Sequence, residues 1–496
     1  MGALSATAAR RKADGDVRFG RQRIAVGLAP MKILRENDFA YQAVYRYLNQ
    51  LLNEPGSNEP VRLPSLRQLA DRLNVSISTI QYAYSLLEKE GRVYSVAKSG
   101  YYARAQTPWT TLGNGEDLLE TLCLHARRPD ICVLSHDDPA AVLPLDSPLL
   151  MLERELLRQY PRQTHVSTQP CGELELRTVL AARYTTSATR CWHAEDVYIG
   201  ADLRGVLEIV ISVLELRGAT MVIESPCDWT ILRLLEANNV RVIELPLQTL
   251  GELDARRLEA LLKTEPIRLI LLSSALNMPH GSLACEDNRR AIASLLTRHG
   301  TWVLENDCYS DLDERLDGQR LRNLLDPERL LVFSSFENVI GAEAPYGFVL
   351  SRQWRNELHR HFLLRSFRMS PIRQKAIARL YAGGRIDHHL PILRRLLKER
   401  RTHLIQLLRD RLGETLQIVE PCGGATVWVR SLRPVDMHAV FQRLLKQQIL
   451  IAPGELFSAN GLHVHHMRLS SLGQGDHDLA AVVGMLADAL RLAPGD

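Results

Sequence analysis

Short polar side chains are concentrated at the start of one helical pattern in the first hundred residues. Hydroxyl and amide groups at the beginning of an exposed helix form hydrogen bonds to base edges and to phosphates. The residues are Ser76, Ser78, Thr79 and Gln81. Their types and spacing predict a helix that contacts DNA, whereas the alternative for Ser76 alone is an ordinary helix N-cap.

The elements around these residues are predicted to position them. One helical pattern begins at Asp38, a second follows Ser65, and a third runs from Ser76 to Gly91. Two short extended runs at 93–96 and 101–103 then form a hairpin. Three helices followed by a hairpin make a winged helix-turn-helix, whose third helix enters the major groove.

Two basic residues complete the predicted interface. Arg67 on the second helix and Lys98 in the wing supply cations for the phosphate backbone. Residues 1–105 contain 16 Lys and Arg against 9 Asp and Glu, whereas the remainder has a net charge of −3. The polyanionic partner, double-stranded DNA, is therefore expected to bind residues 37–105. Residues 1–36 are interpreted as a mobile basic arm, for which the alternative is a merely solvated tail.

The composition excludes several other classes of protein. No stretch approaches the length of a membrane span, and the N-terminus has no apolar signal core, so a cytoplasmic (bacterial) location is expected. The eight cysteines include no Cys-x-x-Cys pair, which argues against a disulfide framework and a zinc ribbon. His463, His465 and His466 lack a further ligand at zinc-like spacing, so no metal site is expected.

The longer part of the chain has a different pattern. After a polar linker at 106–119, apolar runs about 25–30 residues apart alternate with helical patterns as far as about residue 386. This alternation predicts an α/β fold with a mostly parallel sheet. From about residue 386 to 496, helices with a few short strands predict a small C-terminal α+β subdomain within the larger domain of 120–496.

The motif that begins Leu63-Pro64-Ser65-x-Arg67 and ends Ser99-Gly100-Tyr101 resembles the winged helix of the GntR regulators. The rest of the chain resembles the MocR subfamily, in which such a head is fused to a fold-type-I aminotransferase-like domain. Seven short motifs in family order carry this second resemblance. They are Gly172-x-x-x-Leu176-Arg177, Gly200-Ala201, Glu224-Ser-Pro226, Pro279-His-Gly281, Glu305-x-Asp307-x-Tyr309, Pro453-Gly-x-x-Phe457 and Met467-Arg468-Leu469.

The resemblance also identifies departures at the pyridoxal-phosphate site. The family run Ser-Phe-Ser-Lys reads Ser-Phe-Glu337-Asn338, so an amide stands at the Schiff-base position. Pro345 replaces the phosphate-binding Arg, and Asn306 replaces the Asp at the pyridine nitrogen. The remaining departures are Met278 for Asn, Asp228 for the ring-stacking aromatic, and Asp202 in the phosphate cup. Only Tyr309 and the carboxylate-binding Arg468 keep their family identities.

These departures predict a pseudo-enzyme domain with no catalytic residue and no expected cofactor. The resemblance implies a homodimeric transcription regulator with no membrane association, whose effector is an unidentified small molecule or absent. Three acids in the pocket favour a positively charged ligand, unless they are solvated or paired. Two other functions stay open: a regulator that senses pyridoxal phosphate without a covalent bond, and a working aminotransferase with a DNA-binding appendage. The operator, the regulated genes and the direction of regulation are not readable from the sequence.

Overall fold

In a computed structural model of the chain, the described residues before position 116 form one compact unit and those after it form another. Each unit is considered by itself. The structure describes residues 40–53 (side chains to 48), 63–89, 93–96, 100–103, 117–128, 130–160, 169–315, 320–365, 367–473 and 478–493. The predicted arm, residues 106–116 of the predicted linker, and Lys98 in the wing lie outside these residues. The linker prediction extended too far, because Asp117 already caps a helix that begins at Leu118.

The smaller unit contains three helices and a two-stranded sheet. They are α1 (Ala40–Asn53), α2 (Leu66–Leu73), α3 (Ile77–Lys89), β1 (Val93–Val96) and β2 (Gly100–Ala103). The core includes Leu48, Leu69 and Ile80, which are fully buried. Tyr84 Oη donates to Pro64 O at 2.7 Å, and its ring stacks on Tyr101 with centroids 4.4 Å apart. One aromatic residue thus joins the third helix to the hairpin.

Local sequence explains where the second and third helices begin. Ser65 Oγ accepts a hydrogen bond from Gln68 N while Gln68 Oε1 accepts one from Ser65 N, a reciprocal capping box. Asn74 ends α2 in the left-handed conformation (φ 53°) that Asn tolerates well. Thr79 N donates to Ser76 Oγ at 3.1 Å, so Ser76 is the N-cap of α3.

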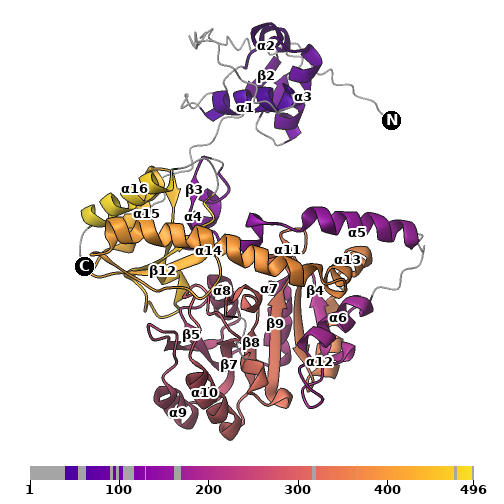
Figure 1. The fold of residues 1–496 in the computed structure, drawn as a ribbon, viewed down its shortest axis with the longest axis vertical. Helices are drawn as coiled ribbons and strands as arrows, with labels where there is room; N and C mark the ends of the chain where they lie inside the picture. Colours follow the sequence, from indigo (N-terminus) through magenta and orange to yellow (C-terminus); the bar gives the residue numbers. More distant parts are fainter. Residues whose placement is uncertain are drawn as a thin grey trace, which may run out of the picture. The chain divides into compact units, whose positions relative to one another are not determined.

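The larger unit is built on a seven-stranded sheet with the order β4-β10-β9-β8-β7-β5-β6 (Figure 1). All neighbouring strands are parallel except β10, which pairs antiparallel with both β4 and β9. The α/β fold with a mostly parallel sheet is therefore confirmed. The strands are β4 (Val197–Gly200), β5 (Thr220–Ser225), β6 (Arg241–Pro246), β7 (Ile267–Ser273), β8 (Val303–Asn306), β9 (Leu330–Ser335) and β10 (Gly347–Ser351).

Helices cover both faces of this sheet. On β5, Val222 belongs to one apolar cluster whereas Met221 and Ile223 belong to another, as expected when successive side chains point to opposite faces. One cluster includes α5 (Asp146–Gln159), α6 (Leu174–Tyr184), α9 (Ala255–Thr264), α10 (Glu286–His299), α11 (Glu337–Ile340) and α13 (Pro371–Ala382). The other includes α7 (Leu203–Val213), α8 (Trp229–Ala237) and α12 (Arg355–Arg365).

The small subdomain has its own sheet, with the order β11-β12-β15-β14. Its strands are β11 (Leu416–Ile418), β12 (Thr426–Ser431), β14 (Ala452–Pro453) and β15 (His466–Ser470). The long α14 (Arg385–Leu412), with α15 (Met437–Lys446) and α16 (Leu479–Leu492), packs on it (Figure 1).

The small subdomain is not purely C-terminal. Residues from α4 (Leu118–His125) and β3 (Cys132–Val133) share its apolar core, and β3 pairs with β13 (Ile449–Leu450). The sequence pattern missed this return of the chain because a two-residue strand leaves no periodic signal. No helix among the described residues combines the length and apolar character that a membrane span requires.

Candidate functional sites

The polar residues at the start of α3 form one hydrogen-bonded group. Ser76 Oγ lies 2.8 Å from Ser78 Oγ and 2.7 Å from Thr79 Oγ1. Ser76, Ser78 and Gln81 are exposed, and so is Arg67 at the second residue of α2. The structure therefore places all the predicted DNA-contacting residues that it describes on or beside two consecutive helices, with Thr79 half-buried and the others exposed.

The acid nearest the end of α3 is engaged within the head. Glu88 Oε1 accepts hydrogen bonds from Ser95 Oγ at 2.7 Å and from Ser95 N at 3.2 Å. This pairing holds a negative charge against β1 at the far end of the helix from Ser76. The start of α3 therefore has neutral donors and acceptors and no carboxylate of its own.

In the larger unit, Asn338 lies on the one-turn helix α11, directly beyond the end of β9. Its Nδ2 donates to Cys308 O at 3.1 Å. The lysines of this unit have other surroundings: Lys375, Lys398 and Lys263 form ion pairs with Glu173, Glu314 and Glu259, and Lys446 is exposed on α15. None of these contacts places a lysine amine next to Asn338.

Asn306 ends β8 beside Asn338. Its Oδ1 accepts from Cys308 N at 3.1 Å, so both amides bond to the backbone of the same residue. The neighbouring acid, Asp307, points elsewhere: its Oδ1 lies 2.8 Å from Arg322 Nη1, and its Oδ2 accepts from Tyr184 Oη at 2.5 Å. Asp307 therefore does not take the place of the acid that Asn306 replaces.

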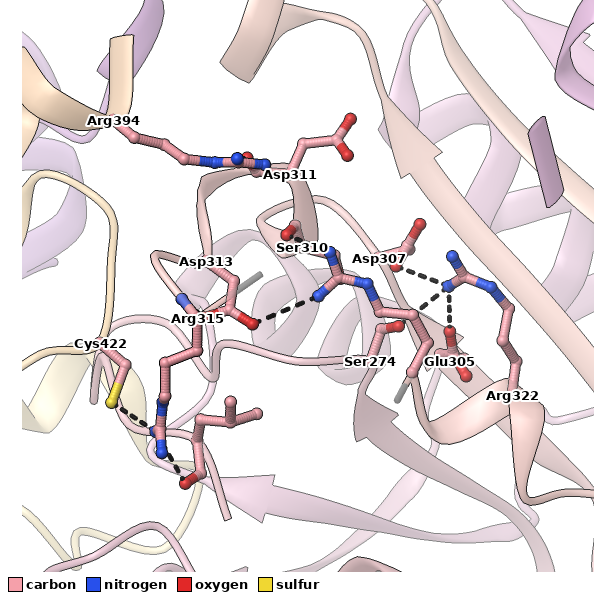
Figure 2. A network of polar contacts seen from close by, with 12 residues as sticks. Ser274, Glu305, Asp307, Ser310, Asp311, Asp313, Arg315, Arg322, Arg394 and Cys422 are labelled. Atoms are coloured by element: carbon pink, nitrogen blue, oxygen red, sulfur yellow. Dashed lines mark hydrogen bonds and ion pairs between the residues drawn. The ribbon is translucent and has the colours of Figure 1, made fainter. Parts of the chain in front are cut away.

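Figure 2 shows the network that holds Asp307. Arg322 Nη1 also contacts Glu305 Oε1 at 2.7 Å and Ser274 Oγ at 3.0 Å. Burial acts to raise the pKa of Asp307, but Arg322 and the hydroxyls of Ser310 and Tyr184 lower it. This cluster ties β8 to its surroundings and leaves the adjacent Asn306 on the other side of the strand.

The start of α7 already holds a carboxylate. Asp202 is the N-cap of this helix, and its Oδ1 accepts from Gly205 N at 2.7 Å. Gly347 of β10 lies against the same turn, where an added Cβ would come within 2.5 Å of Leu203 Cα. A helix N-terminus binds phosphate through its free N–H groups, and here the chain's own acid takes one of them.

Charged groups of both signs lie near Glu337, and a proline stands at position 345. Partial burial and the charge of Asp138 raise the pKa of Glu337, while Arg204 lowers it to a smaller extent. Pro345 is exposed. Glu337 therefore lies near both an acid, Asp138, and a cation, Arg204.

Arg468 on β15 is buried and has partners within the chain. Its Nη1 lies 3.9 Å from Asp137 Oδ2, and its Nη2 donates to Ser135 O. Its guanidinium lies over the ring of Trp229 at 4.4 Å and over that of Phe457 at 4.9 Å. A guanidinium between two rings and beside an acid is stabilised without a ligand.

Asp137 also bonds to the second residue that keeps its family identity. Tyr309 Oη donates to Asp137 Oδ2 at 3.1 Å. Burial raises the pKa of Asp137, against the lowering effects of Arg468 and Tyr309. Sequence analysis missed Asp137, although two successive acids before Pro139 were a usable signal.

The last two predicted positions have structural contacts. Asp228 is the N-cap of α8, with its Oδ1 accepting from Thr230 N at 2.8 Å. Met278 is buried against Gly424, where an added Cβ would lie 3.2 Å from Met278 Cε. Trp229, which follows Asp228, covers Arg468. Of the three pocket acids, Asp202 and Asp228 are thus engaged as helix caps.

The histidine cluster lies where the small subdomain meets the large one. His463 Nε2 is 2.9 Å from Ser225 Oγ, which donates to Glu244 Oε1 at 2.8 Å. His463 precedes β15 and is not on a strand. The described residues contain no group of three or more His, Cys, Asp or Glu that could hold a metal ion.

Two family models match separate parts of the chain. Residues 40–102 match the gntR family of bacterial regulatory proteins, and residues 150–478 match aminotransferase class I and II. The HTH-type transcriptional regulator YjiR of Escherichia coli K12 is 27% identical over 448 residues, covering 87% of this chain and 94% of that protein. The regulator NorG of Staphylococcus aureus is 20% identical, covering 80% of this chain and 93% of NorG.

Solved aminotransferases share the fold of the larger unit. The α-aminoadipate aminotransferase LysN of Thermus thermophilus is 20% identical with a TM-score of 0.67, and the kynurenine aminotransferase of Pyrococcus horikoshii is 20% identical with a TM-score of 0.69. Each match covers 76% of this chain and 95% of the other. At this identity, the similarity shows the fold alone.

Proposed function

Because the chain belongs to the aminotransferase class I and II family and carries a gntR-type head, in the arrangement of MocR-type regulators, we propose that it is a sequence-specific regulator whose larger domain forms no Schiff base. It binds double-stranded DNA through the head and acts in the cytoplasm. The inference that no Schiff base forms rests on Asn338, whose amide bonds to Cys308 O at the Schiff-base position.

DNA binding is supported by the exposure of the predicted contacts. Arg67, Ser76, Ser78 and Gln81 are exposed on two consecutive helices of a winged fold, and Ser76 also bonds to Thr79. In such a fold the third helix enters the major groove and the second crosses the backbone. The basic charge of residues 1–105 supplies the non-specific attraction to phosphate.

The residues present do not fit pyridoxal phosphate. An imine requires a primary amine, and Asn338 has an amide. The phosphate would meet the Asp202 carboxylate at the start of α7, with Pro345 in place of an arginine. Two like charges at ~4 Å repel by about 1 kcal/mol in water and about 4 kcal/mol in a partly buried site. We therefore assign no reaction step to this cofactor.

The larger domain instead serves dimerisation and effector sensing. Its helix α5 buries Leu149 and Leu156, while Leu150, Met151 and Leu157 remain about half exposed or more in the single chain. A helix that is apolar on its outer face as well as its inner face is typical of an interface between subunits. A two-fold dimer would place two heads on two half-sites of one operator.

Titration with pyridoxal phosphate, followed by borohydride reduction and mass spectrometry, tests the assignment of the larger domain. We expect no aldimine absorbance and no reduced adduct. A non-covalent complex that changes the cofactor's absorbance without an adduct would favour the rival cofactor-sensing regulator. An adduct on a lysine of residues 120–496 would contradict the proposal, and transaminase activity would favour the enzyme.

DNA binding is tested with sites selected from a random duplex pool. Arg67→Ala should weaken binding broadly and reduce the slope of log K against log salt by about one charge. The matched control is Arg491→Ala, an exposed arginine at the end of α16. If residues 106–496 alone bind the selected sites as well as the full chain does, the head is not the DNA-binding domain.

A further inference from the structure

One large apolar side chain at the start of α3 is about half exposed. Ile77, the first residue of the helix, is 47% exposed. It is absent from the described residues that pack against the core of the head, although its neighbours Val75 and Ile80 are among them. A large apolar group at this position is therefore available to a partner.

The surroundings of Ile77 favour contact with bases over contact with phosphates. From Ser76 to Ser85 the sequence contains no Asp, Glu, Lys, Arg or His. The hydroxyls of Ser76, Ser78 and Thr79 bond to one another beside it. A neutral surface with one exposed methyl-bearing side chain lacks the cations that bind phosphate. Such a surface matches the major-groove edge of a base pair, which presents donors, acceptors and the thymine methyl group.

Gln81 lies on the same face of the helix as Ile77. Residues four apart on an α-helix are neighbours on its surface, about 6 Å apart along the axis. Since successive bases on one strand are about 3.4 Å apart, two such side chains reach bases one or two steps apart. Gln81 is exposed, and a glutamine amide fits the N6 and N7 groups of adenine with two hydrogen bonds.

We propose that Ile77 contacts the C5-methyl group of a thymine in each half-site and that Gln81 binds an adenine one or two base pairs away. This inference rests on the proposed function, because it requires the head to bind DNA. It adds what that function leaves open: which residues specify the sequence, and which base features they read. Arg67 supplies affinity for any sequence, whereas Ile77 and Gln81 supply discrimination.

The test pairs removal of the side chain with removal of the base group. Sites are first selected from a random duplex pool with the full-length protein, and each thymine is then replaced singly by deoxyuridine, which lacks only the methyl group. At one thymine per half-site we expect the wild type to lose affinity about fourfold, the factor that corresponds to burying one methyl-sized group. Ile77→Ala should lose affinity to a similar degree and then be insensitive to that replacement.

The second arm applies the same design to Gln81. Replacing an adenine by 7-deazaadenine removes the N7 acceptor, so the wild type should lose affinity and Gln81→Ala should not lose more. The control variant is Tyr82→Ala, the other exposed large apolar residue of this helix, whose ring is turned edge-on to Tyr41 at 5.0 Å. Tyr82→Ala should keep the response to deoxyuridine.

The outcomes separate this inference from the proposed function. Selected sites in which no thymine responds to deoxyuridine, or in which Ile77→Ala retains the full response, would overturn the role of Ile77 while leaving sequence-specific binding intact. Full sensitivity of Gln81→Ala to 7-deazaadenine would overturn the role of Gln81. Failure to select any site would instead contradict the proposed function itself. Circular dichroism of each variant, expected to match the wild type, excludes loss of folding as the cause.

Discussion

The two candidate sites differ in where their polar groups find partners. At the start of α3, Ser76, Ser78 and Gln81 are exposed, and the hydroxyls bond only to one another and to the turn that they cap. In the larger unit, Asn338 bonds to the backbone of Cys308, and Arg468 lies beside Asp137 and Ser135. The first site is open to a partner. In the second, most of these groups bond within the chain, although Arg468 Nε and Asp137 Oδ1 are buried without a hydrogen-bond partner among the described residues.

Under the proposed function, this difference is that between an open DNA-binding surface and a former ligand site whose groups bond within the chain. A buried donor without a partner destabilises the fold, so a site without its ligand is stable only when other groups take over the contacts. Asp202 now occupies the helix N-terminus that would face a phosphate, and Asp137 lies against the arginine that would face a carboxylate. Substitutions in the larger unit should therefore change stability, whereas those at the start of α3 should change DNA binding.

The largest effect is expected for Arg322→Met. The substitution leaves Glu305 and Asp307 buried without their shared cation, which should lower the free energy of unfolding by about 3–5 kcal/mol. Denaturant unfolding followed by tryptophan fluorescence measures it, because five of the six tryptophans lie beyond residue 116. Arg491→Met breaks an exposed pair with Asp488 and should change stability by at most about 1 kcal/mol. Equal effects of the two variants would contradict the structural role of the network.

Acid should weaken the larger unit through its buried histidines. Burial lowers the pKa of His280 and His463 to about 4 and that of His466 to about 3, from an ordinary value of 6.5. Below about pH 6.5 the unfolded chain takes up protons that the folded chain does not, so stability falls as the pH drops towards 4. The loss reaches about 1.4 kcal/mol per pH unit for each histidine.

Unfolding measured between pH 7.5 and 4.5 tests this pH dependence. His463→Gln should flatten the decline by the contribution of one histidine. A direct effect of the lost bond to Ser225 would appear equally at pH 7.5 and below, and therefore does not alter the slope. An unchanged slope would mean that His463 is not held neutral by burial.

The smallest of the three effects is expected for Asp202→Ala. Loss of the side chain that caps α7 should lower the free energy of unfolding by about 1 kcal/mol. Asp202→Asn, which keeps an acceptor for Gly205 N, should retain most of that stability. Neither variant should change the affinity for DNA by itself. A loss of DNA affinity with unchanged stability would contradict the contrast between the two sites.

Much of the head could be predicted because its signals are local. Ser65 and Gln68 satisfy each other across one turn, and Ser76 caps the helix that it precedes. The strand at 93–96 was predicted with the bounds that the structure gives. In the larger unit, the buried parallel strands were equally readable, since a strand covered on both faces is a continuous apolar run.

The sequence by itself determined the order of the domains, the α/β class and the identity of the amide at position 338. Only the tertiary structure decided what those residues touch. Asp137 and Arg468 are more than 300 positions apart, and no local pattern indicates that they meet. The exposure of Ile77 is likewise decided by packing. Its neighbours Val75 and Ile80 join the core of the head, and the sequence alone does not show that Ile77 stays outside it. Periodicity reports which residues share a face, and only the packed chain determines what that face meets.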